Sequence, residues 1–195
     1  MKRNTIRLVT LLCALPVSGV ALAHTGSHEV SGFFSGISHP LTGLDHLAVM
    51  LAVGLWAGVA ANRRAWLPVT AFLVFMVIGA VLGMRGIGLP GIETGIAASV
   101  LVMGLLVATL VRLPTVATVA LIGVFALFHG SAHGAEMPSS ATPLLYGIGF
   151  LVATASLHLG GIGLARLLQR SHAEWLFRGA GIVTSGFGAW LLLGA

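Results

Sequence analysis

Apolar stretches separated by short polar breaks make up most of the chain after residue 39. The hydrocarbon core of a bilayer is about 30 Å thick, so a helix needs roughly 20 apolar residues to cross it. Six stretches reach this length, and the loops between them leave no room for a separate domain. They run over 40–61, 66–84, 91–111, 114–133, 143–167 and 175–194. The pattern predicts an all-α membrane protein with six transmembrane helices in one compact domain.

The composition agrees with a bilayer as the solvent of this chain. Of its 195 residues, 57% are hydrophobic and only 8% are charged, whereas a soluble domain carries about 25% charged residues. The net charge of +5 comes from bases scattered between the apolar stretches. A nucleic-acid-binding domain gathers its bases on one face, so we expect no nucleic-acid partner.

The first 23 residues have the composition of a secretory signal. Lys2 and Arg3 precede a short apolar centre, and small residues end the segment at Ala23. We predict a cleavable signal peptide over 1–23 and a mature membrane domain over 24–195; the alternative is an uncleaved first anchor. Cys13 is the only cysteine of the chain and lies in this segment, which disfavours a copper(I) or thiolate-zinc site.

The arginines predict the orientation in the membrane. Beyond the predicted signal segment, all but one lie in the loops after the first, third and fifth stretches or close to them, and Arg85 alone falls in the opposite set of loops. The first set is Arg63, Arg64, Arg112, Arg166, Arg170 and Arg178. Because cytoplasmic loops carry the excess of basic residues, both ends of the mature chain are predicted to be periplasmic. The chain is then a multi-pass protein of a bacterial inner membrane.

Histidines and acids gather at the predicted periplasmic ends of three stretches. Ionisable groups at membrane depth are costly and usually mark an ion or substrate pathway. Imidazole and carboxylate together suit borderline divalent metals such as nickel, cobalt and zinc. The candidate metal ligands are His39, Asp45, His46, Glu93, His129, His133 and Glu136.

Three candidates end the fourth stretch. On a helix, His129, His133 and Glu136 fall within an arc of roughly 60° and share one face. An i,i+4 histidine pair binds one metal in HExxH zinc enzymes, but Gly130–Ala132 supplies no glutamate between the two histidines here. The alternative is a polar helix end that only reaches water.

The first stretch holds three more candidates. His39 and His46 would lie roughly 10 Å apart along a regular helix, which is far for one small ion. Pro40 disfavours helical geometry at the residue before it. We therefore predict that His39 lies on a non-helical lip, either folded over the site or forming a first docking point above Asp45 and His46. The alternative for the Asp45–His46 pair is a structural hydrogen bond between helices.

Glu93 and three further histidines allow two interpretations each. Glu93 is a ligand or only an acid that favours a helix N-terminus. His158, deep in the fifth stretch, is an exit ligand or a packed hydrogen-bonding residue. His24 and His28 begin the predicted mature chain, where a free α-amine could complete a chelate, or they belong to a disordered polar terminus.

Glycines in the apolar stretches predict close helix packing. Pairs spaced by four residues occur at Gly54/Gly58 and Gly79/Gly83, which matches the small-xxx-small pattern. The segment 86–91 matches GxGxxG, but no strand precedes it, so we infer no nucleotide site.

These motifs together resemble the HupE/UreJ family. The likeness covers nearly the whole chain and includes HPxxGxDH at 39–46, a glutamate opening the third stretch, and HGxAHGxE at 129–136. The resemblance implies a permease that supplies nickel, sometimes cobalt, for hydrogenase or urease. The metal would be cargo, with no cofactor permanently bound. Positions that match the family motifs are His39, Asp45, His46, Glu93, His133 and Glu136, and more weakly Phe72.

We therefore expect a secondary permease for Ni²⁺ or Co²⁺ and not an enzyme. The alternative is an intramembrane zinc hydrolase, in which the same ligands activate water. A sensor or chaperone anchor would need a soluble domain, and the pattern shows none. Expected partners are the divalent ion and the lipid bilayer, and a homo-oligomer or metallochaperone contact stays open.

Overall fold

A computed structural model describes residues 32–60 and 64–194, which form helices and contain no strand. The predicted all-α class is thus confirmed. The predicted signal segment, His24, His28 and Arg63 lie outside the described residues. The helices are α2 (Gly32–Thr42), α3 (Leu44–Ala60), α4 (Trp66–Met84), α5 (Ile92–Thr109), α6 (Thr115–Ala135), α7 (Pro143–Arg170) and α8 (Glu174–Gly194).

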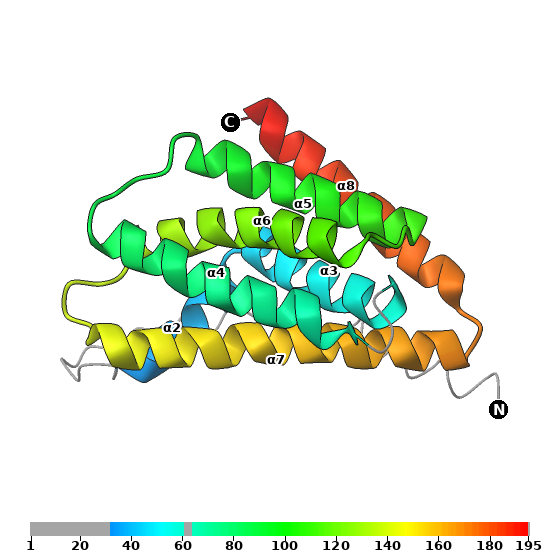
Figure 1. Ribbon diagram of the computed structural model, residues 1–195, viewed down its shortest axis with the longest axis horizontal. Helices are drawn as coiled ribbons and strands as arrows, with labels where there is room; N and C mark the ends of the chain where they lie inside the picture. The colour runs from blue at the N-terminus through cyan, green and yellow to red at the C-terminus, as the bar shows by residue number, and fades with distance from the viewer. Residues whose placement is uncertain (1–31, 61–63, 195) are drawn as a thin grey trace, which may run out of the picture.

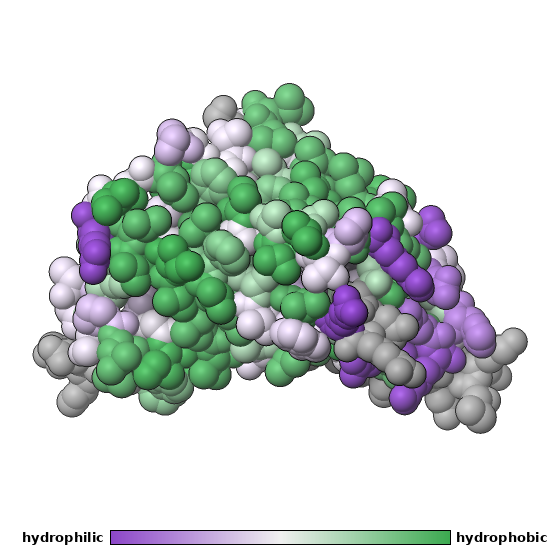
Figure 2. Space-filling view, viewed as in Figure 1, coloured by the Kyte–Doolittle hydropathy of each residue, from purple (hydrophilic) through white to green (hydrophobic). Residues whose placement is uncertain are grey.

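The described helices are those of a multi-pass membrane protein. Helices α4 to α8 are each long and apolar enough to cross a bilayer, and α2 with α3 makes a sixth if this bent pair is one broken span. Large apolar side chains remain outside the core, and Val116 and Leu193 are more than four-fifths exposed. Figure 2 shows hydrophobic residues over the middle of the molecule and hydrophilic ones towards its ends. A lipid-facing surface needs this distribution.

The helices pack side by side around α3, and the pairs α4/α6 and α3/α7 each run in the same direction (Figure 1). Helix α4 packs mainly on α6, α5 on α8, and both α2 and α3 on α7. Val49, Val53 and Trp56 of α3 are at most 1% exposed, so α3 runs through the centre. The ends of α4 and α6 and the starts of α5 and α7 lie at one end of the molecule, on the left in Figure 1. The polar motifs therefore meet at one end.

Glycines allow these helices to approach backbone to backbone. Gly79 and Gly83 of α4 contact backbone carbonyls of α6, and Gly130 and Gly134 of α6 contact those of α4 in return. A Cβ at any of these positions would collide with backbone, so the two helices interlock. The packing positions predicted from the sequence are confirmed at Gly54, Gly58, Gly79 and Gly83.

The first predicted span differs from the structure in two ways. His39 does not lie on a non-helical lip, because α2 continues through Pro40 to Thr42. The chain then turns by 84° at Gly43, so the predicted span 40–61 is divided between α2 and α3. Pro40 removes only one helical hydrogen bond near the end of α2. The close contact of Gly36 with the α7 backbone supplies packing that offsets this loss.

Candidate metal site

Three imidazoles from two helices form the centre of the site. His46 lies in the first turn of α3, and His129 and His133 lie one turn apart near the end of α6. One ring nitrogen from each lies within 4.8 Å of the others. Nitrogens bound at about 2.0–2.1 Å to one zinc-sized ion are at most about 4.2 Å apart, so little closure would be needed. We call His46, His129 and His133 the histidine triad.

A second group reaches the surface and shares one histidine with the triad. His39, His133 and Glu136 also place one ligand atom each within 4.8 Å of one another. Nε2 of His39 lies 3.4 Å from Oε2 of Glu136, and the side chains are 28% and 56% exposed. We call these residues the outer group. Candidate ligand atoms thus extend from exposed Glu136 to buried His133.

The bend at Gly43 brings His39 and His46 to the same histidine. The ring centroid of His133 lies 4.8 Å from that of His39 and 4.2 Å from that of His46. Along a regular helix His39 and His46 would lie roughly 10 Å apart. The last turn of α2 therefore folds His39 over the site, which is one of the two roles expected of the predicted lip.

Asp45 orients the ring of His46. Its Oδ1 accepts hydrogen bonds from the backbone N–H and from Nδ1 of His46, both at 2.8 Å. Nε2 then carries the free lone pair, and this buried atom has no partner among the described residues. Metal-binding histidines commonly donate their second N–H to a carboxylate in this way. The bond lies within one helix rather than between helices, and Asp45 is in neither ligand group.

Ser99 of α5 orients His129, and sequence reasoning missed it. The Ser99 hydroxyl donates to the carbonyl of Ile96 at 2.6 Å. Its oxygen therefore accepts from Nε2 of His129, 2.8 Å away, because the single hydroxyl proton is already used. Nδ1 of His129 keeps the lone pair and is buried without a partner among the described residues. Nothing in the apolar sequence around Ser99 separates it from other small buried residues.

His133 has neither ring nitrogen fixed by a partner. Both atoms are buried and unpartnered in the described part of the chain, and the residue is 3% exposed. Buried polar groups in proteins are normally hydrogen-bonded. One ring with two free nitrogens, placed between two ligand groups, can serve either of them.

Gly43 permits the Asp45–His46 arrangement. A Cβ at this position would lie 2.9 Å from Nδ1 of His46 and 3.0 Å from Oδ1 of Asp45. Any other residue would displace the hydrogen-bonded pair. The close approach at this glycine is therefore made by side chains two and three residues further along the same chain.

Phe72 and His158 extend the site inwards. The ring of Phe72, in α4, lies 5.9 Å from that of His129 and 4.9 Å from that of His158, centroid to centroid. Phe72 and His158 are fully buried. His158 belongs to neither ligand group.

Glu93 does not join either ligand group. It is exposed in the first turn of α5 and lines a surface cavity of about 390 Å³ together with Asp45 and Trp190. Among the described residues, the structure thus brings together His39, His46, His129, His133 and Glu136. Asp45 lies beside this set, bonded to His46, and Glu93 shares only the surface cavity with Asp45.

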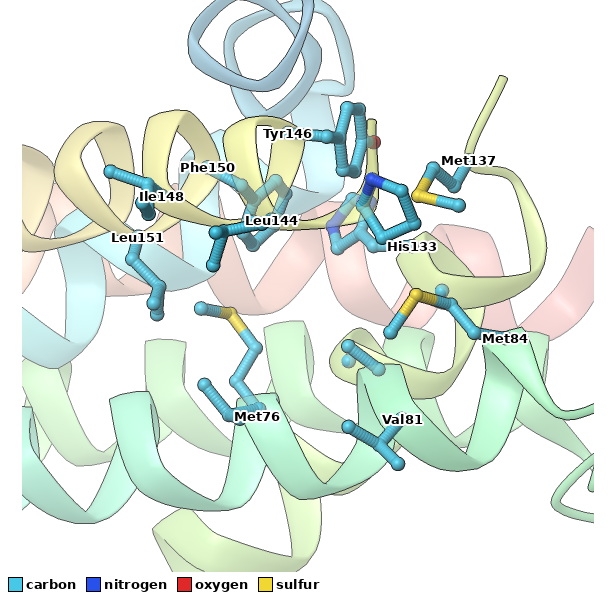
Figure 3. A pocket seen from close by; sticks show the side chains of 16 residues that line it. Met76, Val81, Met84, His133, Met137, Leu144, Tyr146, Ile148, Phe150 and Leu151 are labelled. Carbon is cyan, nitrogen blue, oxygen red and sulfur yellow. The ribbon is translucent and has the colours of Figure 1, made fainter. Parts of the chain in front are cut away.

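His133 also lines an apolar cavity of about 220 Å³ between α4, α6 and α7. Figure 3 shows His133 beside Tyr146, Met84 and Met137 at this cavity. His133 is the single histidine among its 16 lining residues, and no acid lines it. Apolar walls next to the ligands limit access of water from this side.

Comparison with known proteins gives one family. The model of the family described as "HupE / UreJ protein" matches residues 11–191. A curated relative, "Protein HupE" of Rhizobium leguminosarum bv. viciae, is 43% identical over 188 residues, covering 96% of this chain and 98% of that protein. No solved structure matches the chain.

Proposed function

The chain belongs to the HupE/UreJ family, and we propose that it is a permease that takes up a divalent transition metal, nickel or cobalt. The observation that carries this proposal is the sharing of His133 between an exposed and a buried ligand group. Nitrogen and carboxylate ligands, with no cysteine in the described residues, suit borderline divalent ions. As the family resemblance implies, the transported metal would be supplied to hydrogenase or urease.

Capture begins at the outer group in this proposal. Glu136 and His39 are partly exposed, so a hydrated ion exchanges water for their oxygen and nitrogen. His133 then binds the ion with one of its free nitrogens. Each group offers few ligands, which allows the ion to bind and also to leave.

Transfer to the triad follows by ligand exchange at His133. As His39 and Glu136 release the ion, His46 Nε2 and His129 Nδ1 take their places, because these lone pairs are the ones left free by Asp45 and Ser99. The negative charge of Asp45 offsets part of the charge of the ion. The ion thus exchanges ligands one at a time without returning to water.

We place the outer group on the periplasmic side of a bacterial inner membrane. The arginine-bearing junctions support this orientation: Arg64 lies between α3 and α4, Arg112 between α5 and α6, and Arg170 at the end of α7, all at the end of the bundle away from Glu136. Basic residues favour the cytoplasmic side. Both chain ends are then periplasmic.

Transport by purified protein tests the proposal. Liposomes containing the chain should accumulate radioactive Ni²⁺ or Co²⁺ when an inside-negative membrane potential is applied, and each metal should inhibit uptake of the other. Empty liposomes and liposomes with the His46→Ala, His133→Ala double variant are the controls. Uptake no greater than in these controls would overturn the proposed function.

A zinc hydrolase remains the second candidate because three histidines with an open position also hold catalytic zinc. Such an enzyme needs a general base beside the metal-bound water. The acid next to the triad is Asp45, whose Oδ1 is held by His46, and Glu136 lies in the outer group. Zinc-dependent hydrolysis of peptide or ester substrates by protein that transports no metal would favour this candidate.

A further inference from the structure

We propose that His158 is a second, inner binding position for the transported metal, separated from the histidine triad by the ring of Phe72. This inference rests on the proposed function, since it names a further binding residue on the same route. The family motifs do not include His158.

One face of α7 leads from the outer group to His158. Tyr146, Phe150, Thr154 and His158 are spaced by four residues, so they follow one stripe that rotates by about 40° per step. All four are at most 5% exposed. Tyr146 lies 5.9 Å from His39, and Phe150 lies 4.3 Å from His133, between ring centroids. Thr154 and His158 therefore continue, one and two turns deeper, the face that lines the candidate ligands.

The two deeper members of this stripe have polar atoms without partners. Both ring nitrogens of His158 and the hydroxyl of Thr154 are buried and unpartnered among the described residues. On the exposed side of the same helix, Ser156 donates to the Val152 carbonyl at 2.7 Å. A backbone acceptor is thus within reach of a hydroxyl on α7, but Thr154 does not use one. Buried polar atoms left free need an explanation, and a transient ion supplies one.

The alternative interpretation of His158 is a packed hydrogen-bonding residue, and it requires a partner. The backbone of Thr154, one turn earlier on α7, lies near the His158 ring but outside hydrogen-bond geometry, and the ring has aromatic contact with Phe72. The His158 backbone is held at a close contact between α3 and α7, since Gly54 packs against the His158 carbonyl. The ring therefore stays in place without help from a side-chain hydrogen bond.

Phe72 separates the two positions. Its fully buried ring contacts His129 on the triad side and His158 on the inner side. An ion reaches His158 from the triad only when this ring moves aside. The α4 backbone near Phe72 is interlocked with α6 through their glycines, so the movement belongs to the side chain. Two binding positions with one apolar ring between them let an ion advance without an open water-filled channel.

An introduced thiol tests binding at this position directly. In a Cys13→Ser background the chain has no other cysteine. Purified protein with His158→Cys should develop the near-ultraviolet thiolate-to-cobalt absorption when Co²⁺ is added. Ser156→Cys, on the exposed side of the same helix, is the matched control and should not. Absence of the band with His158→Cys, at Co²⁺ concentrations at which equilibrium dialysis shows wild-type protein to be loaded, would overturn the inference.

Transport supplies a second readout. His158→Ala, and His158→Gln as a variant closer in size, should lower the rate of Ni²⁺ uptake by about tenfold or more, with Ni²⁺ affinity of the purified protein changed by less than about threefold. Uptake at the wild-type rate in both variants would contradict a role for His158 while leaving the proposed function intact. If wild-type protein transports no metal, the proposed function itself fails.

Discussion

Single hydrogen bonds decide which nitrogens of the site are free for a metal. Asp45 occupies Nδ1 of His46, and Ser99 occupies Nε2 of His129. His133 has no such partner among the described residues, and it alone belongs to both ligand groups. In the proposed function, the supporting residues therefore orient the histidines, and the histidines bind the ion.

The Asp45–His46 pair gives the first prediction. His46→Ala removes a ligand and should abolish uptake. Asp45→Asn keeps an acceptor for His46 but loses the negative charge, so we expect uptake and metal affinity to fall by about 10- to 100-fold. Ni²⁺ uptake at matched protein abundance checks both. Glu174→Gln, an exposed acid at the start of α8, is the control, and normal uptake by either site variant would remove this pair from the mechanism.

A second prediction concerns Ser99. Ser99→Ala leaves Nε2 of His129 buried without its acceptor, so the ring no longer keeps its lone pair on Nδ1. Ni²⁺ affinity should fall by about tenfold or more, and Ser99→Thr, which retains the hydroxyl, should restore most of it. Equilibrium dialysis of purified protein measures both. Equal affinity of the alanine and wild-type proteins would show that Ser99 does not position His129.

Comparison of His133 with Glu136 gives a third prediction. His133→Ala takes a ligand from both groups and should abolish uptake. Glu136→Gln affects only the outer group, so it should raise the Ni²⁺ concentration for half-maximal uptake more than it lowers the maximal rate. The double variant should be no worse than His133→Ala alone. Simple additivity of the two effects would indicate independent roles.

At the scale of the elements, the sequence predicted most helices because their apolar lengths and breaks are local features. Pro114 and Pro143 lie at helix starts in the structure, as the missing N–H of proline favours. The helix α2 was not predicted, because Pro40 disfavours helical geometry at the residue before it and the first apolar stretch begins at residue 40. Its contact with α7 through Gly36 is a tertiary effect that no local pattern reveals.

The motif of α6 combines two functions that its sequence does not separate. His129 and His133 face the site, whereas the glycine that follows each of them packs against the α4 backbone. One residue along a helix is a rotation of about 100°, so the two sets point in different directions. The sequence predicted the ligands of this motif, but not that Gly130 and Gly134 hold α6 against α4.

The bend between α2 and α3 gives a fourth prediction. Gly43→Ala adds a Cβ about 3 Å from the Asp45–His46 pair and should displace it, so Ni²⁺ uptake should fall to a small fraction of wild type while helix content stays the same. Gly163→Ala in α7, where a Cβ has open space, is the matched control. Uptake assays and circular dichroism check the two parts. Full activity with Gly43→Ala would show that the bend tolerates a side chain.

At the scale of the whole molecule, helices distant in sequence bring exposed and buried candidate ligands together. The sequence predicted that histidines and acids share one end, because topology and helix periodicity are sufficient for that inference. It did not predict which of them meet: His39 reaches His133 only through the bend, and Glu93 lies outside both groups. The contribution of Ser99 depends on the packing of α5 beside α6.

The central claim is that these imidazoles hold the ion, and X-ray absorption at the nickel edge of the loaded, purified protein tests it most directly. We predict nitrogen and oxygen ligands that include two or three imidazoles, without sulfur, and loss of imidazole scattering in the His133→Ala variant. A nickel environment of water and carboxylate oxygens alone, or one that is unchanged in this variant, would contradict the account.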